Sequence, residues 1–326
     1  SISDNGRLVY ALGAGGGGGQ NSLVWVDRAG REDPLGLPLE NYYWPRVSSD
    51  GTRIAVSMND PNNQDVWVSE LARGTLTNLT TDAALDNVPI WTPDGERVVF
   101  TSGRESNQLA FFWKLADGTG PVEQLLRGET SGFFRPWDWS ADGQTLVFGY
   151  QGTGGDTAED IGVLAMGGEG RWEPLLQTAA REGSPAISPD GNWIAYTSDQ
   201  TGRFEVYVER FPELGERRQI SIDGGRAPTW SPVGRELFYR RDSDSAMMTV
   251  PIDTEPVFTP GRPEVVFEAE YRAGGGVARN YDVAPDGERF LMVKQGAPTD
   301  DLGDLAPEIT VVLNWFEELK ERVPVP

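Results

Sequence analysis

The chain has 326 residues and a formal net charge of -22, with 50 Asp and Glu residues against 28 Lys and Arg residues. It contains no histidine and no cysteine, which excludes disulfides, thiolate nucleophiles, Ser-His-Asp triads and metal sites built on imidazole or thiolate ligands. The acidic excess argues against nucleic acid and anionic membranes as partners, because both attract cationic proteins.

A short motif, Ser/Thr-x-Asp-Gly followed by alternating apolar residues, recurs along the whole chain, with substitutions in the first copy and the last two. Its final residues, called marker glycines below, are Gly6, Gly51, Gly95, Gly143, Gly191, Gly234 and Gly287. Successive marker glycines are 45, 44, 48, 48, 43 and 53 residues apart. A spacing this regular indicates repeats of one structural unit.

Each repeat contains the same series of predicted elements. Asp-Gly is the preferred pair for a tight type I′ hairpin, so the motif predicts a turn between two antiparallel strands. Residues 89–91 and 97–101 are such a pair of strands around Gly95. A third strand follows in each unit, as at 65–68, and most units end with a more polar fourth strand, as at 77–80.

Four strands in about 45 residues are typical of a β-propeller blade. We therefore predict an all-β fold, a single β-propeller domain over residues 1–326 with seven four-stranded blades, or six as the alternative. The predicted repeat units are residues 1–41, 42–84, 85–131, 132–180, 181–223, 224–276 and 277–326. Helical periodicity at 314–322 predicts a short C-terminal helix, and no apolar stretch approaches the ~18 residues of a membrane span.

The two terminal units predict how the ring closes. Unit 277–326 offers three strands without a clear fourth, and unit 1–41 begins directly at its innermost strand, residues 1–3. An exposed strand edge is avoided when one blade combines both ends of a chain. We therefore expect the missing outer strand to lie upstream of residue 1, in an N-terminal portion of a longer protein.

The motif also carries a family resemblance. Trp91, Trp139 and Trp230 stand directly before its Ser or Thr, a pattern that resembles the WD40-like Pro-Asp repeats (PD40) of TolB-type propellers, which usually have six blades. Residues 198–208 and 311–319 resemble the C-terminal propeller of bacterial membrane-anchored Ser/Thr kinases, although no kinase segment is present. The resemblance implies a sensor or protein-binding domain in the periplasm or outside the cell, freestanding or carried on a larger membrane-anchored protein.

Propellers bind ligands at the mouth of the central channel. The candidate site consists of residues eight or five positions before the marker glycines, together with Glu182, which is adjacent to such a position. These residues are Arg46, Asn87, Arg135, Asp138, Glu182, Arg226, Arg279 and Asp282. Because arginine presents a planar fork of donors to carboxylates and phosphates, a ring of Arg135, Arg226 and Arg279 predicts a protein partner or a small anion. The alternative is internal pairing of these arginines with the acids of the candidate site and Asp86.

No cofactor is expected. Two acidic clusters, at 59–65 and 156–160, offer oxygen ligands, but neither has the spacing of a calcium loop, and we expect solvated turns there. An alternative function is a hydrolase or lyase that needs no histidine, similar to calcium-dependent lactonases or to glycosidases with paired carboxylates, here Asp138 and Asp282. The absence of a recognisable catalytic motif favours a non-enzymatic interaction or sensor propeller.

Overall fold

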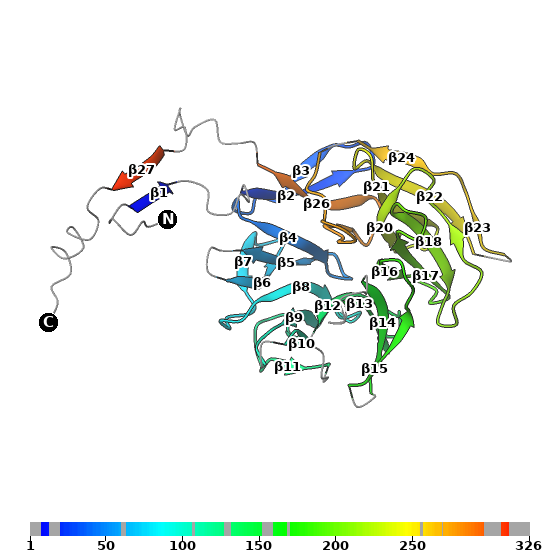
Figure 1. The fold of residues 1–326 in the computed structure, drawn as a ribbon, viewed down its shortest axis with the longest axis horizontal. Coiled ribbons are helices and arrows are strands. Elements are labelled where there is room, and N and C mark those ends of the chain that lie inside the picture. Colours follow the sequence, from blue (N-terminus) through cyan, green and yellow to red (C-terminus); the bar gives the residue numbers. More distant parts are fainter. Residues whose placement is uncertain are drawn as a thin grey trace. The chain divides into compact units, whose positions relative to one another are not determined.

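The computed structural model describes residues 8–12, 20–59, 63–105, 108–126, 132–151, 159–167, 170–254, 257–268, 270–296 and 308–312. Their regular secondary structure is β-strand throughout (Figure 1), so this part of the chain contains no helix long and apolar enough to cross a bilayer. The chain divides into two compact units. One unit is the propeller of residues 20–295, and the other contains the antiparallel pair β1 (Leu8–Leu12) and β27 (Glu308–Val312).

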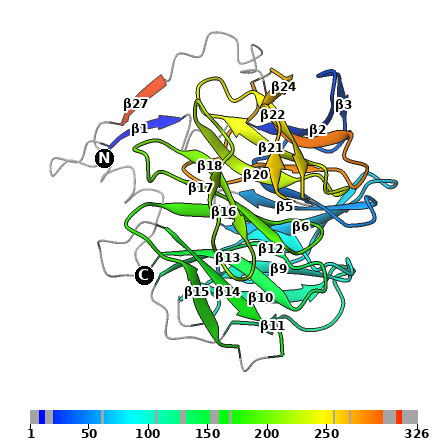
Figure 2. The same ribbon diagram turned by 90° about the vertical axis from the view of Figure 1, so that its right-hand side faces the viewer.

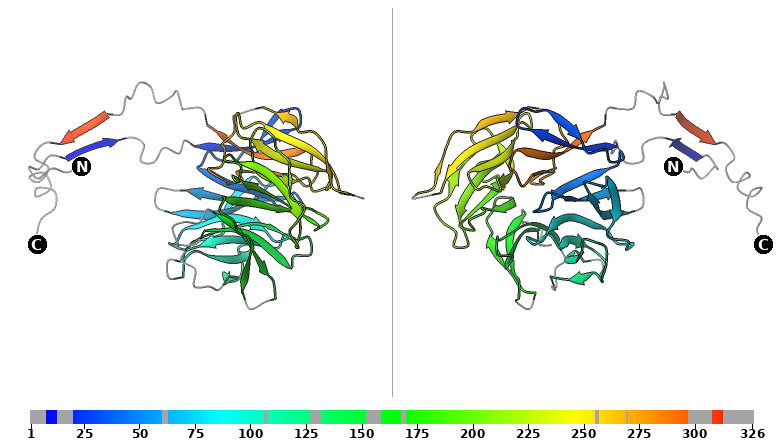
Figure 3. Two further views of the ribbon diagram at one scale, coloured as in Figure 1. Left: turned by 45° about the vertical axis from the view of Figure 1, so that its right-hand side comes forward. Right: turned by 180° about the vertical axis from the view of Figure 1, so that it is seen from behind.

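The propeller has six blades, each built on four antiparallel strands. Blades 1 to 3 are β4 to β7 (Tyr42–Val47, Arg53–Asn59, Gln64–Glu70, Thr75–Asn78), β8 to β11 (Asp86–Trp91, Arg97–Ser102, Ala110–Leu115, Glu123–Gln124) and β12 to β15 (Phe133–Trp139, Thr145–Gln151, Asp160–Ala165, Trp172–Leu176). Blades 4 and 5 are β16 to β19 (Glu182–Ile187, Trp193–Ser198, Glu205–Arg210, Arg218–Gln219) and β20 to β23 (Gly225–Trp230, Glu236–Arg241, Met247–Asp253, Thr259–Pro260), with β24 (Glu264–Phe267) added beside β22. Blade 6 is β25 (Tyr281–Val283), β26 (Arg289–Gln295), β2 (Asn21–Asp27) and β3 (Glu32–Pro34). The colours in Figure 3 follow the blades around the ring in sequence order.

Blade 6 closes the ring by combining the first two strands of the propeller, β2 and β3, with its last two, β25 and β26. β2 pairs with β26 from Asn21 opposite Gln295 to Asp27 opposite Arg289, which places blue and orange strands side by side in Figures 1 and 2. The prediction of all-β propeller architecture is confirmed, but the main count of seven blades is wrong, and the alternative of six is correct. The reason is that the first and last repeats share one blade, which removes two open sheet edges.

The strands expected at the two ends of the chain are used differently from the prediction. Strand β2, predicted as the third strand of repeat 1, serves as the third strand of the last blade, so the structure does not need an upstream strand to complete it. β1 pairs with β27 in register from Leu8 opposite Val312 to Leu12 opposite Glu308. The predicted C-terminal helix lies outside the described residues.

The repeated motif forms a self-contained turn. In blade 1 the Ser48 hydroxyl donates to Asp50 Oδ1 at 2.5 Å, and the amide of Gly51 donates to the Ser48 carbonyl at 2.8 Å. Gly51 has a φ of 71°, while Asp50 is not among the residues with positive φ. The predicted type I′ geometry, which requires positive φ at both central residues, is therefore wrong, although the requirement for glycine stands.

The innermost strands share a second local feature, a β-bulge. The pairing register shifts in β4, β8, β12, β16 and β20. In four of them a non-glycine residue within the bulge has positive φ: Trp44, Val88, Ser184 and Ala227. A bulge bends a strand and changes the direction of its side chains. β25 pairs with β26 without such a shift.

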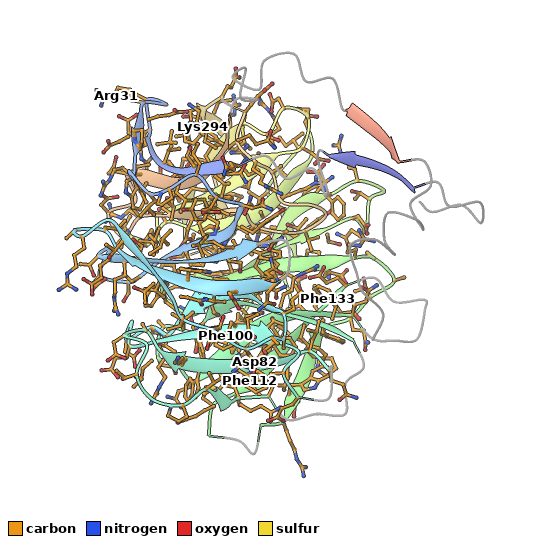
Figure 4. All side chains as sticks on the ribbon, turned by 90° about the vertical axis from the view of Figure 1, so that its left-hand side faces the viewer. Arg31, Asp82, Phe100, Phe112, Phe133 and Lys294 are labelled. Atoms are coloured by element: carbon orange, nitrogen blue, oxygen red, sulfur yellow. The ribbon has the colours of Figure 1, made fainter. Side chains whose placement is uncertain are left out.

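The hydrophobic core lies between neighbouring blades. One cluster combines Val66 and Val68 of blade 1 with Trp91, Phe100 and Phe112 of blade 2. Figure 4 labels Phe100 and Phe112, whose rings stack with centroids 6.4 Å apart. Because each blade buries its two faces against its neighbours, the ring holds the innermost strands in fixed positions around the axis.

Candidate functional site

The innermost strands of all six blades line one cavity of about 380 Å³, called the channel cavity below. Each strand contributes residues close to its C-terminal end, such as Val47 on β4, Ile187 on β16 and Val283 on β25. The cavity therefore lies at the end of the channel where the Ser/Thr-x-Asp-Gly turns gather. The predicted positions five residues before the marker glycines lie at this end, as Arg46, Asp138 and Asp282 show.

The rim of the channel cavity consists of equivalent residues from five blades. Each is the second residue of the repeated motif, and each is exposed: Ser49, Pro93, Ala141, Pro189 and Pro232. Proline has a fixed φ and no backbone donor. The rim is therefore rigid and largely apolar, and it leaves few backbone amides facing an incoming ligand.

Four tryptophans line the walls of the cavity, and two of them are held in place by the neighbouring blade. Trp91 Nε1 donates to the carbonyl oxygen of Arg46 at 3.1 Å, and Trp230 Nε1 donates to that of Ala186 at 3.0 Å. Both bonds join a blade to the one before it. Because these two indoles are fixed in this way, their part of the wall is preorganised before any ligand arrives.

The two predicted channel acids act as clamps between blades. Asp138 of blade 3 accepts the amide of Ile187 in blade 4 at 2.9 Å and the amide of Trp139 at 2.8 Å. Asp282 of blade 6 accepts the amide of Val47 in blade 1 at 2.8 Å. Burial raises the pKa of Asp138, while the positive charge of Arg279 and these amides oppose that rise. Both carboxylates therefore already hold backbone donors.

Arg46 and Arg279 supply the positive charge of the channel cavity. Arg46 is only 3% exposed and donates to the carbonyl oxygens of Pro45 at 2.7 Å and Tyr281 at 3.3 Å. Burial, with the nearby charge of Arg279, lowers the pKa of Arg46 to about 9, which leaves it cationic at neutral pH. Arg279 Nη1 donates to Thr229 Oγ1 at 2.9 Å, and its Nη2 lies 4.0 Å from Asp282.

The other predicted site residues lie away from this cavity. Arg135 pairs with Glu159 at 2.9 Å, and Arg226 pairs with Asp242 of its own blade. Glu182 accepts the hydroxyl of Thr178 at 2.5 Å, Asn87 donates to Gln64 at 3.0 Å, and Asp86 binds Arg104 at 2.8 Å. The structure thus brings together Arg46, Arg279, Asp138 and Asp282 but not the predicted ring of three arginines.

The bulges explain this division. Arg135 and Arg226 stand before a register shift in β12 and β20, and their side chains turn toward partners in their own blades. Arg279 precedes β25, which has no shift, and its side chain reaches the channel. The rim residues stand two positions before the marker glycines, so the repeat locates them as well, but only the three-dimensional structure shows that these turns gather around a cavity.

The acidic clusters considered for calcium are held by ordinary hydrogen bonds where the structure describes them. The Asp65 carboxylate accepts hydrogen bonds from the side-chain amides of Asn63 and Asn78 at 3.1 and 3.2 Å. The Asp160 carboxylate accepts one from the side-chain amide of Gln177 at 3.4 Å. Among the described residues there is no group of three or more acidic side chains placed to hold a metal ion. Residues 60–62 and 156 lie outside that part of the chain.

Comparisons with known proteins support the fold. No family model matches the sequence. The chain is 23% identical over 208 residues to the uncharacterized peptidase YuxL of Bacillus subtilis, which covers 50% of this chain and 31% of that protein. It is 26% identical over 213 residues to the uncharacterized protein Atu1656 of Agrobacterium fabrum, which covers 62% of this chain and 67% of that protein. The chain thus matches about a third of YuxL and two thirds of Atu1656.

Among solved structures, the putative TolB from Agrobacterium tumefaciens has a TM-score of 0.67 at 20% identity, covering 86% of this chain and all of that chain. The oligogalacturonate lyase from Vibrio parahaemolyticus has a TM-score of 0.56 at 14% identity, covering 90% and 82%. These likenesses show a TolB-like β-propeller fold. The finer resemblance to the kinase propellers stays a prediction.

Proposed function

We propose that this protein is a non-enzymatic interaction or sensor propeller that binds an acidic segment of a protein partner, or a small anion, at the mouth of the channel cavity. The observation that carries the proposal is the combination of an exposed rim rich in proline with Arg46 and Arg279 in the cavity below it. Exposed apolar surface surrounding a polar centre is typical of recognition sites. The arginines of the channel would select carboxylates, because charge-assisted hydrogen bonds are strongest with ionised acceptors.

The alternative, a hydrolase or lyase, has support from structural neighbours that include oligogalacturonate lyases. A carboxylate pair in this channel would have to be Asp138 and Asp282. Catalysis by such a pair needs one carboxylate free to attack or to activate water and one acid free to donate a proton. Both side chains here hold backbone amides of adjacent blades, an arrangement that favours a structural role and therefore binding over catalysis.

The cellular setting forms part of the proposal. We place the propeller outside the cytoplasm, on a larger membrane-anchored protein or freestanding, because its fold is that of TolB-like propellers. Fractionation of the bacterium with an antibody against this domain tests the assignment. Recovery in the cytoplasmic fraction would contradict it.

Calorimetric titration of acidic hexapeptides, against peptides in which Asn and Gln replace the acids, tests the binding site. We expect the acidic series to bind more tightly, and Ala141→Trp, which places an indole on the rim, to weaken binding at least tenfold. Ala72→Trp, on an exposed turn between β6 and β7, is the matched control and should bind like the wild type. Equal affinity in both variants would remove the rim from the site.

A further inference from the structure

A second cavity, of about 200 Å³, lies between blades 5 and 6 and shares no lining residue with the channel cavity. It is called the interblade cavity below. Its walls come from Ala227 on β20, Arg240 on β21 and Met292 on β26, together with the loop that leads into β25. Four arginines line it: Arg226, Arg240, Arg241 and Arg272.

Arg240 is the unusual member of this group. It is only 9% exposed, and its Nε, Nη1 and Nη2 have no hydrogen-bond partner among the residues that the structure describes. Asp244, an acid whose charge acts on Arg240, is itself engaged by Arg241 through two contacts of 2.5 and 2.9 Å. The phenol of Tyr281 donates to the Ala227 carbonyl at 2.7 Å. A buried cation without an ionic partner is costly, so its position calls for an anion.

The repeat shows how far Arg240 departs from the other blades. It stands six residues after its marker glycine, and the equivalent residues are small or apolar: Ser57, Thr101, Gly149, Thr197 and Val293. Three of these bond to the next blade. Ser57 Oγ accepts the amide of Val88 at 3.2 Å, Thr101 Oγ1 donates to Phe134 at 2.8 Å, and Thr197 Oγ1 accepts the amide of Ala227 at 3.0 Å. Blade 5 replaces this short bridge with a guanidinium beside a cavity.

The other charges around the interblade cavity are compensated or engaged. Arg226 pairs with Asp242, and Arg241 pairs with Asp244. Arg272 donates to Asn41 at 3.2 Å and lies over the ring of Tyr43. Of these four guanidinium groups, that of Arg240 is the one for which the described residues supply neither a hydrogen bond nor an ion pair.

The loop that leads into β25 forms one wall of the cavity and is tightly packed. A Cβ at Gly274 would lie 2.1 Å from the carbonyl oxygen of Ala278, so only glycine fits there. The Gly276 carbonyl accepts Arg226 Nη1 at 2.9 Å, and the Val277 carbonyl accepts the hydroxyl of Ser184 in blade 4. A loop anchored on blades 4 and 5 limits the cavity to small ligands.

We infer that the interblade cavity is a binding site for a small oxyanion, either inorganic phosphate or an organic carboxylate, held by the guanidinium of Arg240. Both kinds of group match the planar donor fork of arginine. Ala227 and Met292 leave room for a short apolar body if the ligand is organic. The site is separate from the channel cavity and independent of the function proposed there.

Calorimetry and thermal unfolding of the full chain test this site, with sodium phosphate and sodium succinate as probes and sodium chloride at matched ionic strength as reference. We expect at least one probe to bind and, at a hundred times its Kd, to raise Tm by roughly 5–10 °C. Arg240→Thr introduces a residue that two other blades carry at this position, and it should abolish both effects. Arg240→Lys, which keeps the charge without the fork, should weaken binding at least tenfold.

Arg210→Gln, which removes one exposed positive charge from blade 4, should bind like the wild type. Binding of phosphate alone would assign the site to phosphate groups, and binding of succinate alone would assign it to carboxylates. No binding of either probe, or an equal Tm shift in wild type and Arg240→Thr, would overturn the inference. If Arg240→Thr does not fold, unchanged affinity in Arg240→Lys would overturn it. Ala141→Trp, the variant at the rim of the channel cavity, should bind phosphate or succinate like the wild type. This result would distinguish the interblade cavity from the channel cavity.

Discussion

Replacement of Gly191 by valine tests whether the repeated turns depend on the left-handed conformation of their glycines. Gly191 has a φ of 74°, and a Cβ at this position would meet no atom within 4 Å. The substitution therefore probes backbone strain without a steric clash. In a β-branched residue this strain costs ~2–3 kcal/mol. The lost freedom of glycine in the unfolded chain offsets ~0.4–1 kcal/mol.

The free energy of unfolding should fall by roughly 1–2.5 kcal/mol, which corresponds to a decrease in Tm of about 2–10 °C. Urea denaturation measures the change, and the m-value should stay constant because the fold is unchanged. Gly95→Val should cost about as much, since Gly95 has a φ of 69° and its Cβ would reach Ser49 Oγ only at the ordinary contact distance of 3.4 Å. Gly275→Val is the matched control, because Gly275 has open space around it and no left-handed φ.

The control should be neutral or slightly stabilising. Unchanged urea midpoints for Gly191→Val would refute the left-handed turn. An equal loss in Gly275→Val would show that the cost belongs to any glycine replacement and not to the turn.

Two further predictions concern buried acids. Burial and the neighbouring Asp160 raise the pKa of Glu182 above its usual 4.5. The carboxyl group of Glu182 therefore binds its proton more tightly in the folded state than in the unfolded state. The stability that this proton supplies should be fully present below pH 4.5 and be lost as the pH rises through the folded-state pKa. Urea midpoints measured from pH 4 to 8 test this. As the pH rises, the stability of Glu182→Gln should increase relative to that of the wild type, and a difference that does not change with pH would contradict the reasoning. Asp282→Ala should lower the free energy of unfolding by about 3 kcal/mol, because it leaves the amide of Val47 and the charge of Arg279 without their acceptor. The control is Asp190→Ala at an exposed position, which removes only contacts within its own turn and should cost less than half as much. Equal losses in the two variants would contradict a role of Asp282 in closing the ring.

Much of the fold is encoded locally and could be predicted from the repeats. The motif forms its turn from its own atoms, as when the Ser188 hydroxyl donates to Asp190 and accepts the amide of Trp193. Alternating apolar residues after each turn, such as Ile194 and Tyr196, supply the faces that pack between blades. Such signals depend on residues close in sequence, so each of the five central repeats can be recognised by itself.

Ring closure and the binding sites depend on contacts between distant residues. Whether β2 completes its own repeat or the last blade is decided by its pairing with β26, more than 260 residues away, because both choices satisfy the same strand pattern. The inner-strand bulges decide which arginines reach the axis, so Arg279 faces the channel while Arg226 turns to Asp242. In the sequence, Arg240 stands out as the one large charged residue at its repeat position. Only the packing of blade 5 on blade 6 buries it without a hydrogen-bond partner among the described residues. Burial and ionic pairing depend on the neighbours that the fold brings together, so the sequence alone does not reveal them.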